Sequence, residues 1–201
     1  MKYRIASDGA TAAAITLNGD SISTDAAGVT VVGSTATITQ AGAYLLSGML
    51  NDGQIVVDTQ DVAIVQLILN GVDLASSSSA PIYIRDAEKA VILLAEGSSN
   101  TVSDASTYIY ASAEEDEPNA AIFSTADLSI GGSGSLTVTG NFNDGIASKD
   151  GLVIASGTIA VTALDDGILS QAGQNAQNYL YRLFIELGYP EVIFQSPTPT
   201  P

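Results

Sequence analysis

The chain has 201 residues, enough for one domain with a substantial core. It contains 22 acidic and only 6 basic side chains, for a formal net charge of −16. This charge disfavours nucleic acid and anionic membrane surfaces as partners and makes cations the natural ones. The sequence has neither Cys nor His, which excludes thiol nucleophiles, imidazole bases and the usual zinc ligand sets. Any bound metal is therefore expected to be a hard ion held by oxygen.

The first 40 residues predict an N-terminal β cap and the first strands. Residues 1–4, MKYR, resemble the basic start of a signal peptide, but Asp8 and Gly9 stand where its apolar core should follow, so no signal peptide is predicted. Apolar and polar residues then alternate with the two-residue period of a β-strand. This alternation covers residues 15–17, 29–32, 36–38 and 44–46.

Residues 41–172 contain a repeat of variable length. We call each repeat a row, and the five rows begin at Ile55, Ile82, Ile122, Ile146 and Ile168, at intervals of 27, 40, 24 and 22 residues. The interval of 40 fits the others if residues 107–117, TYIYASAEEDE, form an inserted loop. Strands this short cannot bury an apolar face alone, so the rows must stack, which predicts a parallel β-solenoid. An antiparallel sandwich is the alternative.

Stacked rows place equivalent residues about 4.8 Å apart. Carboxylates stacked at that distance repel unless they are protonated or bridged by a cation, and Ca²⁺ is the ion best suited to a mixed set of carboxylate, amide and carbonyl oxygens. The alternative is that Asn and Asp occur there only as turn residues. The two ladders are Asn119, Asn143 and Asp165, and next to them Ala120, Asp144 and Asp166.

Three further predictions concern the neighbourhood of these ladders. The acidic run EEDE could contribute Asp116 or Glu117 to the metal site, although such a run is more often a solvated loop. Tyr108 and Tyr110 precede the run, are expected to be exposed and could stack on a sugar ring. Lys149 is a candidate ligand-binding residue and the best-placed base, but it could simply offset Asp150.

The pattern changes after residue 172. Residues 173–195 predict a short helical or extended segment that caps the last row or docks on another subunit, because Tyr179, Leu180, Leu183, Phe184 and Leu187 fall on one face of a helix. Residues 196–201, with their alternating Thr and Pro, favour a polyproline-like tail, which could be a linker or a stalk glycosylated at Thr198 and Thr200.

Several stretches, EPNAAIFS and NDGIASKD above all, resemble the bacterial extracellular carbohydrate-binding domain family, which includes clostridial cellulose- and pectin-binding β-helix proteins. The resemblance covers about residues 11–170. It implies a right-handed parallel β-helix that is secreted, binds calcium and plant cell-wall or acidic polysaccharides, and has no established catalytic activity. The family's acidic corner residues would fall on Asn143, Asp144, Asp165 and Asp166. Members usually continue with further coils where this chain changes pattern.

We therefore expect an all-β, extracellular or cell-surface bacterial protein that binds calcium and polysaccharide without catalysis. A structural subunit of an extracellular filament, formed by head-to-tail contacts between solenoid ends, is the second hypothesis. A calcium-dependent uronate lyase with Lys149 as its base is the third. No apolar run is long enough to span a membrane.

Overall fold

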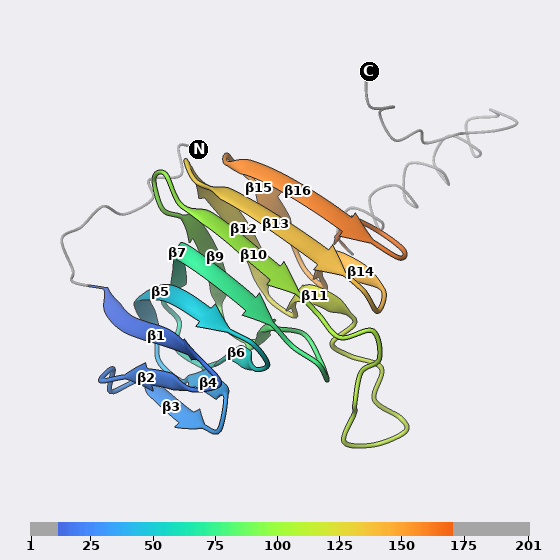
Figure 1. Ribbon diagram of the computed structural model, residues 1–201, viewed down its shortest axis with the longest axis horizontal. Coiled ribbons are helices and arrows are strands. Elements are labelled where there is room, and N and C mark those ends of the chain that lie inside the picture. The colour runs from blue at the N-terminus through green and yellow to red at the C-terminus, as the bar shows by residue number, and fades with distance from the viewer. Residues whose placement is uncertain (1–11, 171–201) are drawn as a thin grey trace, which may run out of the picture.

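A computed structural model describes residues 12–170, and this part of the chain is all β, with seventeen strands and no helix (Figure 1). The strands form a ten-stranded and a seven-stranded sheet, and neither sheet closes on itself. Within the described residues there is accordingly no helix able to cross a bilayer. The predictions for residues 1–11 and for the segments 173–195 and 196–201 fall outside the described part.

The predicted stacking of the rows is confirmed in the seven-stranded sheet. Ile55 pairs with Ile82, Ile82 with Ile122, Ile122 with Ile146 and Ile146 with Ile168, always between parallel strands. The first residue of each row therefore lies directly against the first residue of the next. The strands concerned are β6 (Gln54–Asp58), β8 (Ile82–Asp86), β11 (Ala120–Ser124), β14 (Asp144–Ser148) and β17 (Ile168–Ser170).

The ten-stranded sheet divides into two branches at β7 (Val65–Ala75), the longest strand. The first half of β7 pairs with β9 (Lys89–Leu94) and the second half with β10 (Ser99–Ser103), again in parallel. One branch continues through β12 (Asp127–Gly132) to β15 (Leu152–Ile154), and the other through β13 (Ser135–Gly140) to β16 (Thr158–Ala163). A typical row thus gives one strand to the smaller sheet and two to the larger.

The N-terminal end of the stack is built differently, with antiparallel pairs. The strands here are β1 (Ala13–Gly19), β2 (Ile22–Thr24), β3 (Val29–Val32), β4 (Thr35–Ile38) and β5 (Gly42–Leu50). The pairs β1–β2 and β3–β4 are antiparallel, whereas β1–β5 and β4–β6 are parallel. The four strands predicted in this region are confirmed, whereas β2 was not predicted.

The core lies between the two sheets. Equivalent residues of successive rows point into it and stack on one another. Leu67, Ile92 and Ile130 are neighbours on adjacent strands and none of them is exposed. The corner after β12 requires glycine: Gly132 has φ of +113°, and a Cβ there would lie 2.1 Å from the carbonyl oxygen of Leu94. The backbones of adjacent rows therefore approach too closely at this corner for any side chain.

A long loop of residues 104–119 joins β10 to β11 and projects beyond the sheets (Figure 1). It contains the predicted insertion 107–117, which is confirmed as a loop. Part of the loop packs on the outer face of the smaller sheet, where Tyr108 joins a second apolar cluster with Phe123 and Ala147. The insertion therefore gives the β11–β14 region a second buried layer outside the main core.

Candidate functional site

The predicted ladders meet at the end of the smaller sheet, where the chain enters β11, β14 and β17. Ala120 pairs with Asp144 in parallel register. The backbone N–H of Asp144 donates to the carbonyl oxygen of Asn119 at 3.2 Å, and that of Asp165 donates to the carbonyl oxygen of Asn143 at 3.1 Å. The structure therefore brings the Asn and Asp positions of three successive rows together, as the repeat predicted.

Asp144 is the central residue of this corner, because its side chain is only 1% exposed. Its Oδ1 atom accepts a hydrogen bond of 3.2 Å from the backbone N–H of Asp166, while its Oδ2 atom has no hydrogen-bond partner. Burial raises the pKa of this carboxyl, the bond from Asp166 opposes that rise, and the nearby charges of Asp166 and Asp165 add to it.

A second buried oxygen without a hydrogen-bond partner lies in the preceding row. The Oδ1 atom of Asn119 is buried and also has no hydrogen-bond partner. A buried acceptor without a partner costs about 1–3 kcal/mol, and more if it is charged. Both unpartnered atoms, Asn119 Oδ1 and Asp144 Oδ2, are hard oxygen acceptors on adjacent rows, which is the donor chemistry that Ca²⁺ requires.

The other predicted ligands differ in their surroundings. Asp165 and Asp166 are exposed, and Asn143 is half-buried. Asp116 is exposed on the loop, and its recorded contact is through its carbonyl oxygen, 3.4 Å from the Tyr110 hydroxyl. Between residues 12 and 170 there is no group of three or more Asp, Glu, His or Cys side chains arranged around a metal position. A cation at Asp144 would therefore need amide, carbonyl or water oxygens as well.

The expected exposure of Tyr108 is wrong. Its side chain is 6% exposed and its ring stacks on that of Phe142, with centroids 4.4 Å apart. Its hydroxyl donates to Asp104 Oδ2 at 2.7 Å and lies 3.0 Å from the carbonyl oxygen of Ala120. Because the ring is already covered by Phe142, Tyr108 cannot stack on a sugar and instead anchors the loop.

Asp104 was missed by the sequence reasoning, although it organises the turn that leads into Asp144. It is 5% exposed and accepts hydrogen bonds from the backbone of Asn141 and Phe142 as well as from the hydroxyl of Tyr108. Burial raises the pKa of the Asp104 carboxyl, and these hydrogen bonds oppose the rise. The stretch SDAS looks like any polar turn, so the sequence offers no signal for this role.

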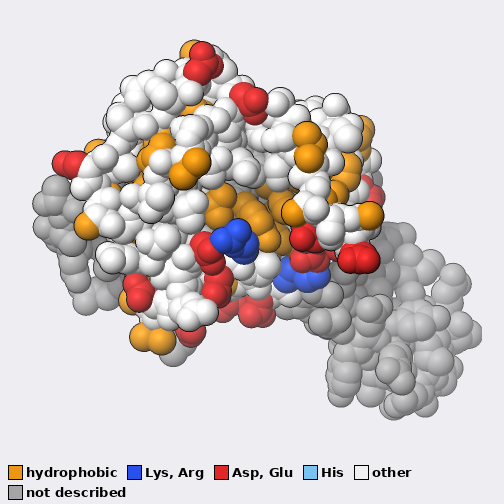
Figure 2. Space-filling view, turned by 90° about the horizontal axis from the view of Figure 1, so that it is seen from below, with side chains coloured by type: hydrophobic (Ala, Val, Ile, Leu, Met, Phe, Trp, Pro, Cys, Tyr) orange, Lys and Arg blue, Asp and Glu red, His pale blue; other side chains and the backbone are white. Residues whose placement is uncertain are grey.

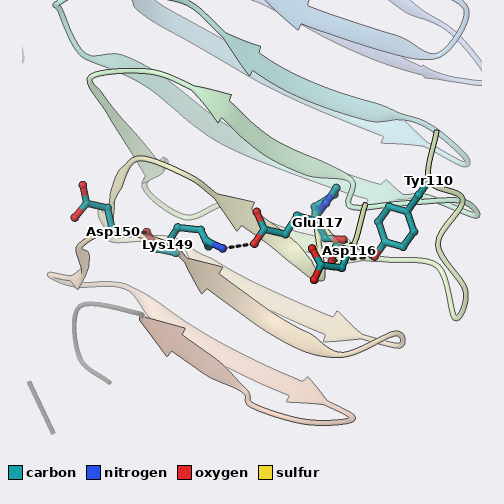
Figure 3. A network of polar contacts seen from close by, with 7 residues as sticks. Tyr110, Asp116, Glu117, Lys149 and Asp150 are labelled. Atoms are coloured by element: carbon teal, nitrogen blue, oxygen red, sulfur yellow. Dashed lines mark hydrogen bonds and ion pairs between the residues drawn. The ribbon is translucent and has the colours of Figure 1, made fainter. Parts of the chain in front are cut away.

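Tyr110 and Lys149 remain accessible, and Lys149 follows the end of β14 opposite to Asp144. Tyr110 is half-buried, and its hydroxyl donates to the carbonyl oxygen of Pro118 at 2.9 Å. Lys149 forms an ion pair with Glu117, not with Asp150, and Figure 3 shows its side chain reaching toward the loop that carries Glu117. The Lys149 side chain is still 43% exposed, so a ligand could reach its ammonium group.

A second basic side chain occupies the same position two rows earlier. Ile84 pairs with Ser124, and Ser124 pairs with Ser148, so Arg85 and Lys149 each follow equivalent residues. Arg85 forms an ion pair with Asp58. In the space-filling view, the few basic side chains in sight lie against acidic ones, close to exposed apolar groups (Figure 2).

Comparison with known proteins shows the family to which the chain belongs. It belongs to the family of carbohydrate-binding domain-containing proteins, whose model matches residues 32–177. It is 45% identical over 126 residues to a carbohydrate-binding domain-containing protein of Acetivibrio thermocellus. That match covers 63% of this chain and 44% of the relative, so the chain spans less than half of the relative's length.

The fold is also similar to a solved structure. This is the gadolinium derivative of a polysaccharide lyase-like protein from C. thermocellum, with a TM-score of 0.74 and 41% sequence identity. The similarity covers 76% of this chain and 62% of the solved chain. Over the matched part, the two chains share an all-β architecture.

Proposed function

We propose that the chain is a non-catalytic, calcium-dependent polysaccharide-binding module built on a right-handed parallel β-helix. The single observation that carries this proposal is the pair of buried, unpartnered oxygens at Asn119 and Asp144, in a member of a carbohydrate-binding family. Parallel pairing of every row with the next supports a β-helix. A continuous right-handed coil is the usual hand for parallel strands joined by crossovers.

Asn119 and Asp144 would hold the ion, with Asn143, backbone carbonyls and water supplying further oxygens, and Asp165 and Asp166 would add negative charge nearby without all three carboxylates binding the ion directly. When bound, Ca²⁺ supplies positive charge that offsets the carboxylates and can bridge them to an acidic sugar. The buried Asp144 carboxylate then gains the partner that its Oδ2 atom lacks. Burial and the charges of Asp165 and Asp166 both disfavour the ionised form of Asp144. A bound cation would offset that cost in free energy.

The polysaccharide is proposed to extend from this corner, near Tyr110, along β14 to Lys149, which is accessible at the other end of that strand. Lys149 offers a positive charge to a uronate carboxylate, in exchange with Glu117. An acidic plant cell-wall glycan such as pectate fits this arrangement, because both Lys149 and a corner-bound cation attract anionic sugars. The high acidity of the rest of the chain would repel such a glycan elsewhere.

We favour binding over lyase chemistry for a physical reason. Proton abstraction from a uronate needs a free base near the sugar, and the Lys149 ammonium is engaged by Glu117. The Asp104 carboxyl is buried and already accepts hydrogen bonds from Tyr108 and from the backbone of Asn141. The Asp144 carboxyl is buried as well and, in this proposal, binds the cation. We also propose that the protein works outside the cell, at the bacterial surface, where a calcium-dependent module would meet plant glycans.

Affinity chromatography on immobilised pectate and cellulose tests the proposal. Retention on pectate should require Ca²⁺, disappear on addition of a chelator, and be abolished in the double variant Asp144→Ala with Asp166→Ala. Asp61→Ala is a matched control, because it removes an acidic side chain that accepts a bond from Ala41 on the first rows, away from the corner. Equal retention with and without Ca²⁺ would overturn the proposal, as would release of an unsaturated product.

A further inference from the structure

Equivalent apolar residues of successive rows stack inside the core, and each such series is buried until it reaches the last row. Ile82, Ile122 and Ile146 are 0% exposed, whereas Ile168, the next residue of the same ladder, is 47% exposed. A second ladder in the larger sheet behaves in the same way: Ile130 is 0% exposed and its neighbour Ile154 is 41% exposed. The core thus ends in an open apolar cross-section.

The strand edges at this end are open as well. Each of β15, β16 and β17 pairs with only one neighbour, and none of the strands of residues 12–170 lies beyond them. Unpaired parallel edges next to exposed apolar side chains are templates for association with another chain. A protein that stays in solution must therefore cover this surface, which we define by Leu152, Ile154, Ile159, Val161 and Ile168 and call the open end.

The other end of the stack shows that this openness is not a general property of terminal rows. There β2 adds to β1 and β3 adds to β4, both in antiparallel pairs that turn back over the first row. Ile15 and Ile38, on the terminal parallel strands, are 0% exposed. Val29 and Val31 of β3 also pack against the core. The chain therefore closes its first end with its own residues.

A segment suited to close the second end follows in the sequence. Its apolar residues Tyr179, Leu180, Leu183, Phe184 and Leu187 have the spacing of one helix face, and Asn178 and Ile185 fall on the opposite face. Four residues lie between Ser170 and Asn175, and the five steps from one Cα atom to the other span about 17 Å when extended. That reach is enough to place the segment across the sheets it follows.

We propose that residues 175–187 of the same chain cover the open end by laying this apolar face on Ile154 and Ile168. The segment then does for the last row what β2 and β3 do for the first. Intramolecular occupation is favoured over a second copy of the chain because the short linker keeps the segment at a high effective concentration next to its target. The open end becomes an internal surface of the full chain rather than an assembly interface.

Disulfide trapping in the full chain tests the proposal cleanly, because the natural sequence has no cysteine. Ile168→Cys is combined in turn with Tyr179→Cys, Leu180→Cys, Leu183→Cys, Phe184→Cys or Leu187→Cys, and the products of mild oxidation are separated without reductant. We expect an intrachain disulfide in a monomer from at least one of these pairs, and none from Ile168→Cys with Asn178→Cys, which is the matched control. Disulfide-linked dimers alone, or no disulfide from any pair, would overturn the proposal.

A second measurement keeps the proposal testable without cysteines. Leu183→Asp places a charge on the proposed contact face, and Asn178→Asp places the same charge on the opposite face. The first variant should bind more of a dye that reports exposed apolar surface and should melt at a lower temperature, whereas the second should match the natural chain. Equal behaviour of the two variants would contradict the covered surface, as would a concentration-dependent oligomer in the natural chain.

Discussion

Asp144 and Asp166 share one hydrogen bond, in which the backbone N–H of Asp166 donates to Asp144 Oδ1 at 3.2 Å, and this bond leaves Asp144 Oδ2 buried without a partner. The two residues occupy the same corner on successive rows, so the fold itself places the second acidic side chain next to the first. The calcium proposal depends on this relationship, because one backbone donor satisfies only half of a buried carboxylate.

The pKa of Asp144 leads to a pH-dependent prediction for the calcium-free protein. Burial first, and then the charges of Asp166 and Asp165, raise that pKa above its ordinary value of 3.8. The folded protein then binds the proton more tightly than the unfolded chain, so the stability cost of Asp144 is full above the raised pKa and disappears as the pH falls through it toward 3.8.

The comparison that isolates this effect is denaturation of the natural chain and of Asp144→Asn across that pH window, both with a chelator present. The variant carries no charge at position 144, so it should be the more stable protein near neutral pH. Its advantage should shrink as the pH falls. A gap that stays constant with pH would mean that Asp144 does not titrate in the folded protein as proposed.

A second prediction concerns the anchor of the loop. Tyr108→Phe keeps the ring that stacks on Phe142 but removes the hydroxyl that bonds to Asp104. Because a buried carboxylate oxygen loses its partner, unfolding free energy should fall by about 1–3 kcal/mol, which for a chain of this size lowers the melting temperature by roughly 2–4 °C for each kcal/mol.

Tyr110→Phe is the matched control for that experiment. Its hydroxyl bonds to the Pro118 carbonyl from a half-buried position, so water can replace the lost bond. Calcium affinity should also fall in Tyr108→Phe, since Asp104 holds the turn at Asn141 that leads into Asp144. Equal melting temperatures for the two variants would show that the Asp104 contact does not hold the corner.

Much of the fold could be predicted from the sequence, because one residue type recurs at one position of each row. Ile122, Ile146 and Ile168 predicted a register that the strand pairs confirm, and that register in turn brought Asp144 and Asp166 together. Burial within the loop could not be predicted. Tyr108 looks accessible in a polar, acidic stretch, and only the packing of its ring on Phe142 makes it an anchor.

The ion pair between Lys149 and Glu117 predicts that substitutions of its two partners change retention on pectate in opposite directions. Glu117→Gln removes the competitor for the Lys149 ammonium and should strengthen retention on pectate, whereas Lys149→Ala should weaken it. Retention on uncharged cellulose should not change. The pair is partly exposed, so its contribution to stability should stay below about 1 kcal/mol, and urea denaturation of both variants checks that folding is intact. Parallel changes in the two variants would contradict a role for Lys149 in binding.

The row architecture itself predicts a large difference between two isoleucines. Ile122 is fully buried between adjacent rows, and Ile122→Ala should lower unfolding free energy by about 2–5 kcal/mol. Ile109 lies on the loop and is 77% exposed, so Ile109→Ala should change it by less than about 0.5 kcal/mol. Denaturant titration distinguishes the two cases. A cost for Ile109→Ala close to that for Ile122→Ala would mean that the loop belongs to the core.

If a calcium ion is the missing partner of Asp144, thermal melting with and without Ca²⁺ will reveal it. We expect the order of melting temperatures to reverse: with a chelator Asp144→Asn melts above the natural chain, and with saturating Ca²⁺ the natural chain melts above the variant. The natural chain alone should gain stability with each increase in Ca²⁺ concentration. Equal calcium-dependent shifts in the two proteins, or no shift in either, would contradict the claim.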